Sequence, residues 1–390
     1  MNPPNMKVLV APDKFKGSLD APAAARALAG GMRQHRPDIS FVEHPVADGG
    51  DGFLNALGGY GFRSQSVAVT GPLREQVIAE FGVCGNSAVV EMATSSGLKT
   101  VAGRVLNPMA ATSYGVGELL VAARESGATK IVVGVGGSAT TDGGAGMLVA
   151  LGARLLDADG QVLPDCGPAE LRRVARVDLS GLRTDLASVR MLVACDVDSP
   201  LTGPTGAARV FAPQKGASPQ EVDVLERALQ HWADVLELAT GRSSRDIPGV
   251  GAGGGVPFAL ANVFQASLSP GIEVLLSLSG FDGLLSQASL VITGEGQLDT
   301  QSLMGKAPLG VLRAARRHRV PTIAVVGANL LSPAQSEAAG FTAVYSVTDL
   351  EPDLDTAMRT ADQLLTKLGS QVAHIHICGR GQPRGVDNDQ

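Results

Sequence analysis

The chain has 390 residues, of which 44% are hydrophobic and 18% are charged, and its formal net charge is −6. This length predicts two domains. Because no basic stripe accompanies the negative charge, the composition argues against nucleic acid as a main partner. No run of about 18 apolar residues occurs, so we expect no membrane-spanning segment and no membrane partner.

Neither the first residues nor the cysteines suggest an exported protein. The first residues, MNPPNMKVLVAPDKF, lack an apolar core behind a basic segment, so we expect no signal peptide and a cytoplasmic location. The four cysteines, at positions 84, 166, 195 and 378, form no C-x-x-C pair. A zinc site or a disulfide framework is therefore not expected.

The N-terminal segment is typical of an α/β protein. MKVLVAP (6–12) predicts a buried strand, and FVEHPVADGG (41–50) predicts a second strand that leads into a glycine loop. Between them we expect a helix that is capped by Ser18 or Asp20, with Pro22 in its first turn. This order of strand, helix and strand is the α/β signature.

The middle of the chain has a different pattern. Residues 66–93 are rich in valine with turn residues between the apolar runs, which favours antiparallel strands. A strand and a helix flank the glycine-rich stretch 134–146, and a further strand is expected at 189–197. Residues 218–240 predict an amphipathic helix with Ser218 as its cap and Glu221 three residues later.

Alternating strands and helices return near the C-terminus, at 288–296, 320–327 and 341–347. We therefore predict a discontinuous domain (1–64 with 286–375), in which the N-terminal and C-terminal strands share one parallel sheet. Residues 65–285 would form an inserted α/β domain, and 376–390 a disordered tail. The cleft between the two domains would be the natural ligand site.

Four glycine-rich stretches carry the main functional signal, at 46–52, 134–146, 249–255 and 292–299. Glycine lets the backbone approach an anion, and successive N–H groups can line a concave anion site. A helix that begins at Gly144 or Ala145 would direct its N–H groups at a phosphate. The alternative is that the glycines only permit tight turns.

A dinucleotide site is a second alternative for the same stretch. Gly134-x-Gly136-x-x-Ala139 fits a loose form of the G-x-G-x-x-G/A pattern, and Asp157 follows at about the expected distance. We disfavour this interpretation because Asp157 lies in LLDADG, which predicts a turn. The Walker A pattern is also absent, so lysines that face a phosphate must come from elsewhere.

Phosphoryl transfer needs cations for the phosphates and carboxylates for a divalent metal. The candidate lysines, all beside glycine or proline or just after the first strand, are Lys14, Lys16, Lys215 and Lys306. The candidate carboxylates at strand ends or in glycine loops are Asp13, Asp48, Asp51, Asp142, Asp196, Asp198, Glu295 and Asp299. Surface lysines and turn-forming aspartates are the alternative explanation. Asp196 stands out because it ends the apolar run MLVACD.

Several long motifs resemble the glycerate kinase family of the bacterial glycerate 2-kinase type. They include APDKFKGSL, PVADGGDG, VVEMATSSGL, GVGGSATTDGGAG, ACDVDSPL and VITGEGQLDTQSLMGKAPLGV, and they cover the chain to about residue 370. The resemblance implies ATP- and Mg²⁺-dependent phosphorylation of D-glycerate to 2-phosphoglycerate. It also implies two α/β domains, one Rossmann-like or flavodoxin-like and one inserted, with the active site between them.

The chain departs from the pattern of that family at three places. Residues 249–255 carry an extra glycine where alanine is common, and Ser199 stands where asparagine is common. Gln297 replaces an arginine that often follows GEG, so only neutral hydrogen bonds can be made there.

The resemblance and the positions together assign roles. We expect the ATP phosphates to be held by Gly136, Gly137, Ser138, Thr140, Thr141, Asp142, Gly143 and Gly144. We expect Lys14, Lys16 and Lys306 to neutralise the transferring phosphoryl group or to bind the glycerate carboxylate. Asp196 would be a metal ligand or the general base, with Asp48 and Asp51 as the next candidates. Substrate would also contact Glu295, Gly296 and Asp299.

The expected partners are therefore ATP, Mg²⁺ and D-glycerate, and a homodimer is left open. Alternatives are a glycerate 3-kinase, a kinase of a related small hydroxy acid, and a non-catalytic anion-binding protein. The abundant loop carboxylates argue against the last of these, since a carboxylate repels an anion unless a metal lies between them.

Overall fold

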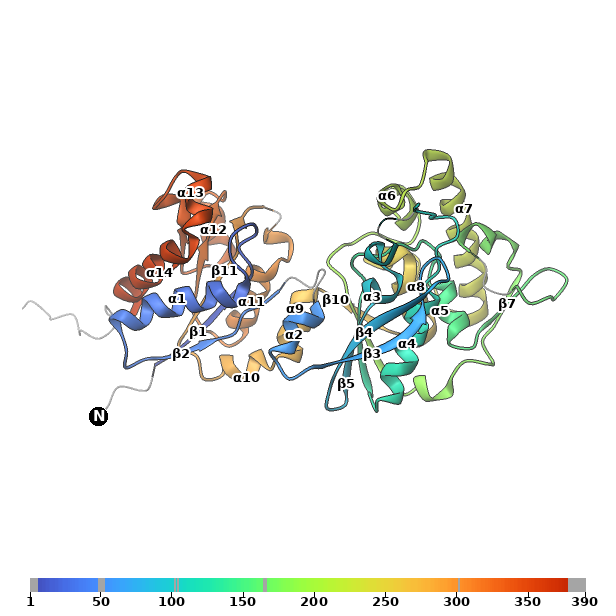
Figure 1. Ribbon diagram of the computed structural model, residues 1–390, viewed down its shortest axis with the longest axis horizontal. Coiled ribbons are helices and arrows are strands. Elements are labelled where there is room, and N and C mark those ends of the chain that lie inside the picture. The colour runs from blue at the N-terminus through green and yellow to red at the C-terminus, as the bar shows by residue number, and fades with distance from the viewer. Residues whose placement is uncertain are drawn as a thin grey trace, which may run out of the picture. The chain divides into compact units, whose positions relative to one another are not determined.

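The structure is a computed structural model, and it describes residues 6–47, 53–101, 103, 105–163, 167–300 and 302–377. The chain forms two compact units, and many of their elements are labelled in Figure 1. Unit 1 comprises Met1–Asp48 and Leu275–Gln390, and unit 2 comprises Gly49–Val274. Both units combine helices with a sheet, which confirms the predicted α/β fold class.

Unit 1 is built on a five-stranded parallel sheet with the strand order β15-β13-β11-β1-β2. The strands are β1 (Lys7–Pro12), β2 (Ser40–Glu43), β11 (Leu290–Gly294), β13 (Thr322–Val326) and β15 (Ala343–Ser346). Val10 of β1 lies opposite Ile292 of β11, so the N-terminal and C-terminal strands do share one sheet. Numbered along unit 1 alone, the order is 2-1-3-4-5, which is the flavodoxin-like order.

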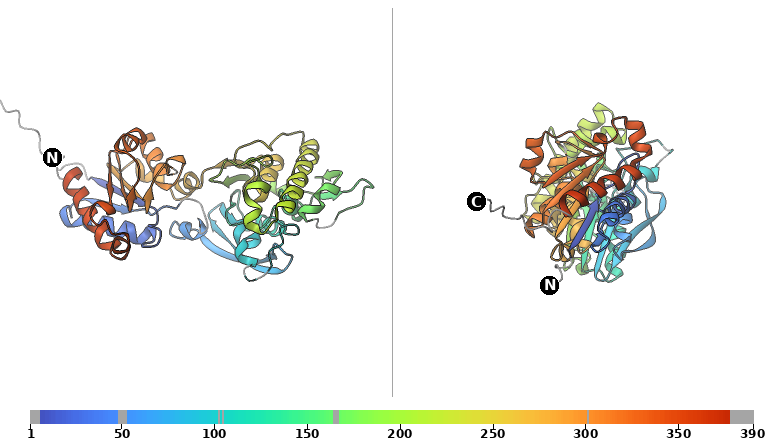
Figure 2. Two further views of the ribbon diagram at one scale, coloured as in Figure 1. Left: turned by 90° about the horizontal axis from the view of Figure 1, so that it is seen from above. Right: turned by 90° about the vertical axis from the view of Figure 1, so that its left-hand side faces the viewer.

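Helices cover both faces of this sheet, as Figure 2 shows. They are α1 (Ala21–His35), α10 (Phe281–Leu285), α11 (Ala307–Arg317), α12 (Pro333–Ala339), α13 (Leu354–Arg359) and α14 (Ala361–Val372). Consecutive residues of β13 contribute to two different cores. Ile323 packs in the core that contains α1 and α14, and Ala324 packs in the core that contains α11. Burial on both faces explains why the central strands are apolar throughout.

The helix α1 begins where the sequence predicted. The Asp20 side chain caps it by accepting a hydrogen bond from the Ala23 N–H at 2.7 Å. α1 then packs closely against α14, because a Cβ atom at Gly31 would lie only 1.9 Å from the Thr366 carbonyl oxygen. Glycine at position 31 therefore permits a backbone-to-backbone contact between the two helices.

Unit 2 contains a six-stranded mixed sheet with the order β10-β9-β6-β5-β4-β3. Its strands are β3 (Arg63–Thr70), β4 (Gln76–Cys84), β5 (Ser87–Glu91), β6 (Lys130–Gly134), β9 (Arg190–Ala194) and β10 (Ser267–Ser269). The pairs β3–β4 and β4–β5 are antiparallel, as predicted. The pairs from β5 to β10 are parallel, so the carboxyl ends of β6 and β9 lie at the same edge.

The longest helix of unit 2 is α7 (Pro219–Thr240). Ser218 and Glu221 form a complete capping box at its start, which confirms the predicted cap. Trp232 of this helix is fully buried in the main core of the unit. The other helices of the unit are α2 (Phe53–Gly58), α3 (Met92–Ser96), α4 (Tyr114–Glu125), α5 (Ala145–Ala150), α6 (Ala207–Phe211) and α8 (Val256–Phe264). The helix α9 (Gly271–Leu278) contains the boundary with unit 1.

Smaller elements complete the fold. Two short strand pairs are β7 (Arg154–Leu156) with β8 (Arg176–Asp178), and β12 (Gln297–Leu298) with β14 (Ala328–Asn329). The 3₁₀ turns are Leu98–Val101, Pro168–Arg173, Thr184–Leu186, Pro213–Lys215, Ala252–Gly255, Ser302–Met304 and Val347–Asp349, and a π-helical turn covers Ala373–Ile377. Of the predicted tail, residues 378–390 lie outside the described residues.

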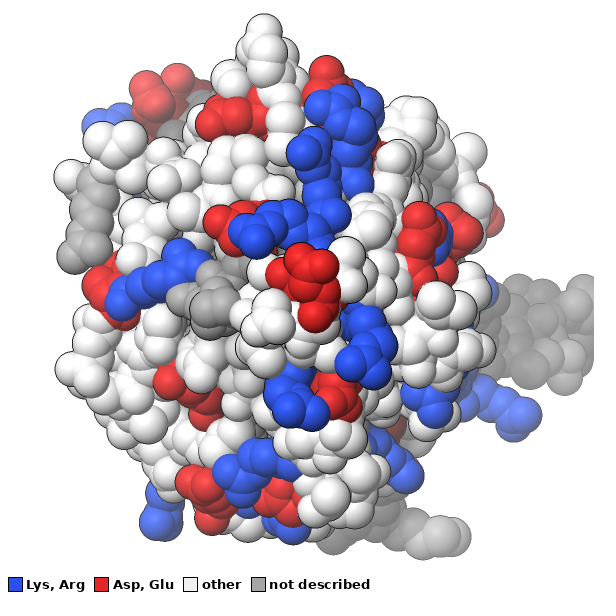
Figure 3. Space-filling model, turned by 90° about the vertical axis from the view of Figure 1, so that its right-hand side faces the viewer, with Lys and Arg blue, Asp and Glu red and all other residues white. Residues whose placement is uncertain are grey.

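Two observations bear on possible partners: the distribution of surface charge and the character of the helices. Figure 3 shows a face on which basic and acidic side chains are interspersed rather than separated. Ion pairs such as Arg183–Glu125 (2.9 Å) and Arg209–Asp223 (3.2 Å) occur on the surface of unit 2. Among the described residues, no helix combines the length and the apolar character that crossing a membrane requires.

Candidate active site

The sheet of unit 1 changes direction between β1 and β11. From β1 the chain continues through α1 to β2 on one side, and from β11 it continues through α11 to β13 on the other. Open α/β sheets bind ligands at such a switch point, in the crevice outside the carboxyl ends of the strands. Asp13 directly follows β1, and Glu295 directly follows the neighbouring β11. Two predicted carboxylates therefore lie where this fold places ligands.

A cavity of about 720 Å³ occupies this edge of unit 1. Lys14, Lys16 and Lys306, the three lysines that the sequence assigned to the site, line it together with Glu295 and Gly296. Its remaining wall is partly apolar and comes from the segments after β15 and from α13 and α14. The cavity thus offers positive charge, the two buried carboxyl groups of Asp13 and Glu295, and apolar surface, in a volume typical of small-molecule sites.

Glu295 is a buried acid of this cavity with a strongly raised pKa. Its side chain is 8% exposed, and its Oε1 atom has no hydrogen-bond partner among the described residues. Burial raises the pKa of Glu295 to about 7, and the nearby charge of Lys306 only partly opposes this effect. A carboxyl group with a pKa near 7 can accept a proton at neutral pH, which is the property of a general base.

The loop after β11 positions the remaining predicted residues of unit 1. Asp299 accepts a hydrogen bond from the Ser302 N–H at 2.8 Å, and this bond lowers the pKa of Asp299. The Lys306 ammonium lies 3.6 Å from Asp299 Oδ1. The amide of Gln297, which stands where the family often has arginine, donates to the other oxygen of Asp299 at 3.1 Å. Asp299 therefore orients Lys306 and Gln297 beside the cavity.

A second cavity, of about 250 Å³, lies in unit 2 at the carboxyl ends of β6 and β9. It is lined by Gly136, Gly137 and Ser138 from the loop after β6, and by Cys195 and Asp196 from the segment after β9. The sequence assigned four of these five residues to the site. Tertiary structure thus brings the first part of the glycine-rich loop and Asp196 to one cavity.

The first part of the glycine-rich loop has unused backbone donors. Leu98 N–H donates to the Gly137 carbonyl, and Ala139 N–H donates to the Ser96 carbonyl, so the loop is held at both sides. Within the described residues, the N–H groups of Gly136, Gly137 and Ser138 donate to no other group of the chain. Gly137 has a φ of 69°, and a left-handed residue inside such a run makes a concave anion site.

The second part of the loop serves the fold. Asp142 is fully buried, and its carboxylate accepts hydrogen bonds from Ser113 Oγ and from the N–H groups of Ser113, Gly144 and Gly146. Burial raises the pKa of Asp142, while these bonds act in the opposite direction. The first N–H groups of α5 thus meet a protein carboxylate, so we assign Asp142 a positioning role.

The glycines beside Asp142 permit close packing. Gly143 N–H donates to the Gly254 carbonyl at 2.9 Å, which joins the loop to the glycine-rich stretch at 249–255. A Cβ atom at Gly143 would lie 2.4 Å from Trp232 Cδ1, and one at Gly144 would lie 2.6 Å from Ala259 Cβ. Packing against α7 and α8 therefore accounts for glycine at both positions.

Thr140 and Thr141 are also fully buried, and neither hydroxyl has a hydrogen-bond partner among the described residues.

Asp157, the acid of the disfavoured dinucleotide pattern, closes a turn by accepting hydrogen bonds from Asp159 N–H and Gln161 N–H. This turn is the one that the sequence predicted. A ribose-binding role for Asp157 therefore gains no support from its surroundings.

Asp196 is exposed and follows β9 after one intervening residue. Its Oδ1 atom accepts a hydrogen bond from the Gly271 N–H, at the start of α9, at 2.8 Å. A carboxylate has about four acceptor positions, so Asp196 can bind a metal ion while it accepts this backbone hydrogen bond. Its neighbour Cys195 has a pKa that is raised by burial.

Of the four candidate lysines, Lys215 is the one for which the sequence predicted no specific role. It is 2% exposed and lines the cavity of unit 2. Its ammonium donates to Ser138 Oγ at 2.9 Å and to the Thr140 carbonyl at 2.5 Å. Burial lowers the pKa of Lys215 to about 7. The only local signal was its position between proline and glycine in APQKGAS.

The structure describes only some of the predicted metal ligands. Asp48 and Asp51 lie outside the described residues, so their predicted roles stay predictions. In the described part of the chain, no group of three or more His, Cys, Asp or Glu side chains could hold a metal. Mg²⁺ in phosphoryl-transfer sites commonly uses one or two carboxylates and the substrate phosphates, so a single carboxylate such as Asp196 fits it.

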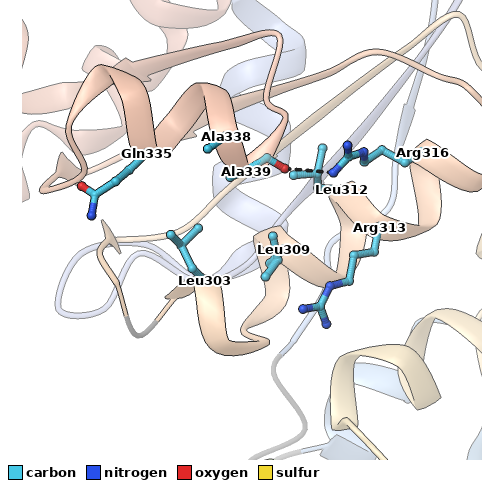
Figure 4. A pocket seen from close by; sticks show the side chains of 8 residues that line it. All are labelled: Leu303, Leu309, Leu312, Arg313, Arg316, Gln335, Ala338 and Ala339. Carbon is cyan, nitrogen blue, oxygen red and sulfur yellow. Dashed lines mark hydrogen bonds between the residues drawn. The ribbon is translucent and has the colours of Figure 1, made fainter.

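A third hollow, of about 400 Å³, lies between α11 and α12 in unit 1. Figure 4 shows it, with the Arg316 guanidinium donating to the Ala339 carbonyl at 3.2 Å. Its lining residues are Leu303, Leu309, Leu312, Arg313, Arg316, Gln335, Ala338 and Ala339, and none of them belongs to the predicted site.

Comparison with known proteins gives a consistent result. The family model described as "Glycerate kinase family" matches residues 8–377. A protein named glycerate kinase from Bacillus subtilis (strain 168) is 42% identical over 94% of this chain and 97% of its own length. A protein named glycerate 2-kinase from Escherichia coli (strain K12) is 41% identical over the same shares. A crystal structure of a protein assigned as glycerate kinase 2 from Salmonella typhimurium LT2 superposes with a TM-score of 0.84 at 39% identity, covering 97% of this chain and all of that one.

Proposed function

Because the chain belongs to the glycerate kinase family, we propose that it transfers the γ-phosphoryl group of ATP to the 2-hydroxyl of D-glycerate, with Mg²⁺. The products would be 2-phosphoglycerate and ADP. The name glycerate 2-kinase of the Escherichia coli relative supports the choice of hydroxyl. In this reaction the substrate oxygen forms a bond to the γ-phosphorus, and the bond from that phosphorus to the β,γ-bridging oxygen breaks.

The observation that carries the proposal is the cavity of unit 1. It combines Lys14, Lys16 and Lys306 with the buried carboxyl group of Glu295 at the switch point of the sheet. The lysines would bind the glycerate carboxylate and neutralise charge on the transferring group. Glu295 would accept the proton that the substrate hydroxyl loses, since its Oε1 is unpaired and its pKa is raised to about 7.

We assign the ATP phosphates to the Gly136–Ser138 part of the loop in unit 2. Three successive N–H groups that have no acceptor in the described part of the chain, together with the adjacent buried Lys215, support this assignment. Asp196, in the same cavity, would hold Mg²⁺. Bound Mg²⁺ would supply charge neutralisation at the phosphate oxygens. Asp142, Gly143 and Gly144 would keep the loop in shape.

The reaction can be tested directly. Purified protein is mixed with D-glycerate, ATP and Mg²⁺, ADP release is followed, and the product is passed to enolase without a mutase. ADP release with direct formation of phosphoenolpyruvate is the expected result. ADP release without that conversion would indicate the 3-hydroxyl. No ADP release with D-glycerate, L-glycerate or other small hydroxy acids would refute the kinase proposal, and loss of activity with EDTA would support the metal.

A further inference from the structure

Lys215 is an unusual lysine because its ammonium group is buried and forms no direct contact with a carboxylate among the described residues, although the charge of the buried Asp142 acts on it. The side chain is 2% exposed, and both of its hydrogen-bond partners, Ser138 Oγ and the Thr140 carbonyl, are neutral. It forms no ion pair with any carboxylate of the described residues. Burying an ammonium group without a counter-charge is costly. A protein that keeps such a group commonly uses it at a functional site.

The position of Lys215 suggests that use. An ammonium group has three donors, and the protein accepts two of them. Lys215 lines the 250 Å³ cavity together with Gly136 and Gly137, whose N–H groups have no acceptor among the described residues. A positive charge and backbone donors therefore converge on one small cavity. An anionic oxygen that enters it would supply a direct ion-pair partner for Lys215, which Asp142 does not contact.

A purely structural role is the competing explanation. The ammonium joins Ser138 and Thr140, and it could serve only to fix the loop. A neutral donor could make the same two bonds without the cost of a buried charge. The charge of Asp142 accounts for part of the charge on Lys215, but a ligand also accounts for the cavity beside it and for the unused N–H groups.

We propose that the Lys215 ammonium binds an anionic oxygen of the ligand in the unit 2 cavity, either a phosphate oxygen of the nucleotide or the carboxylate of glycerate. The identity of these two ligands rests on the proposed function. Ser138 and Thr140 hold the ammonium in place, and the ligand takes its third donor. Lys215 is thus a binding residue of the cavity in addition to a support for its loop.

The test separates charge from hydrogen bonding. Lys215→Gln keeps a neutral donor near Ser138 and Thr140, whereas Lys215→Met removes both charge and donor. Lys130→Gln is the matched control, because Lys130 lies at the amino end of β6, whose carboxyl end begins the same loop. The readouts are kcat, the KM for ATP, the KM for D-glycerate, and the thermal midpoint without ligand.

We expect Lys215→Gln to raise one of the two KM values about 10- to 100-fold, as expected for a lost charge-assisted hydrogen bond. Its thermal midpoint should stay close to that of the unmodified protein. An increase in the KM for ATP identifies a phosphate oxygen, and an increase in the KM for glycerate identifies the carboxylate. If Lys215→Gln leaves both KM values unchanged, the proposal is overturned although the kinase function stands.

Two further measurements apply if the unmodified protein is inactive or if the variants fail to fold. If the unmodified protein has no kinase activity, the proposed function fails, and stabilisation by ATP alone or D-glycerate alone is compared between it and Lys215→Gln. Equal stabilisation, or none in either protein, overturns the inference. If the variants fail to fold, ligand affinity of the unmodified protein is followed from pH 7 to pH 9.

Affinity should fall with rising pH, by up to about tenfold per pH unit, because the ammonium loses its proton. The other titratable groups that face Lys215 are the buried Asp142 and the cavity residues Asp196 and Cys195. A Cys195→Ser background removes the thiol from the comparison. Affinity that is independent of pH would overturn the inference.

Discussion

Replacing Glu295 by glutamine should remove most of the turnover while making the folded chain more stable at alkaline pH. Glutamine has nearly the same shape but cannot accept a proton from the substrate hydroxyl. General-base catalysis typically contributes about 10²- to 10⁴-fold, so we expect kcat to fall by that factor. In the unmodified protein, kcat/KM should rise with pH through about 7, as Glu295 ionises, and this rise should be absent from the variant.

The stability effect follows from the same raised pKa. Burial moves the pKa of Glu295 from 4.5 to about 7, so the folded state binds a proton that the unfolded state releases between these pH values. Stability therefore falls as pH rises from about 4.5 to about 7. At about 1.4 kcal/mol per pH unit, the loss is about 3 kcal/mol above pH 7. Glutamine carries no charge, so the variant avoids this loss.

The assay compares urea unfolding of both proteins at pH 5 and pH 8, together with kcat over the same pH range. The free energies of unfolding should be close at pH 5, and the variant should be the more stable protein at pH 8. Glu337→Gln, an exposed carboxyl group of α12, is the control and should change neither quantity. A Glu295→Gln protein with kcat within about threefold of the original would refute the role of Glu295 as base.

Three further substitutions test the site and its framework. Asp196→Asn should lower kcat at least about 100-fold, because asparagine binds Mg²⁺ poorly. Its thermal midpoint should be unchanged, because asparagine keeps an oxygen that accepts from the Gly271 N–H. Near-normal turnover would remove Asp196 from the mechanism. Lys306→Met should raise the KM for glycerate about 10- to 100-fold in steady-state assays, and an unchanged KM would contradict its role. Gly143→Ala should destabilise the chain by about 1–2 kcal/mol for its positive φ and by about 1–3 kcal/mol more for the contact with Trp232. Gly241→Ala, at a φ of 68° in open space, is its control in urea unfolding and should show only the first of these costs.

The sequence predicted the parts of the fold that depend on neighbouring residues. Asp20 and Ser218 cap their helices because the side chain and the N–H groups that it accepts from lie within three residues. The apolar runs that became β1, β11 and β13 are buried on both faces, so their composition alone indicated central strands. The resemblance to the glycerate kinase family is confirmed by the family model and the relatives.

The glycine-rich loops show where a local pattern stops being informative. Gly136, Gly137, Gly143 and Gly144 all belong to one motif, yet the first two line a cavity and the last two pack against helices. Glycine is required in both situations, because a side chain would block either an approaching ligand or an approaching backbone. Only the positions of Trp232 and other distant residues distinguish the two cases.

The same limit applies to the charged residues. Asp142 and Asp196 both lie in a segment that follows an apolar strand, but one is fully buried with four protein donors and the other is exposed. Lys215 was one lysine among several, and it is buried because Ser138 and Thr140, more than 70 residues earlier, lie against it. Burial decides whether a charge is solvated, paired or held for a ligand, and burial is a property of the tertiary structure. A buried lysine beside unused N–H groups is therefore a functional signal that no pattern of neighbouring residues in APQKGAS could have provided.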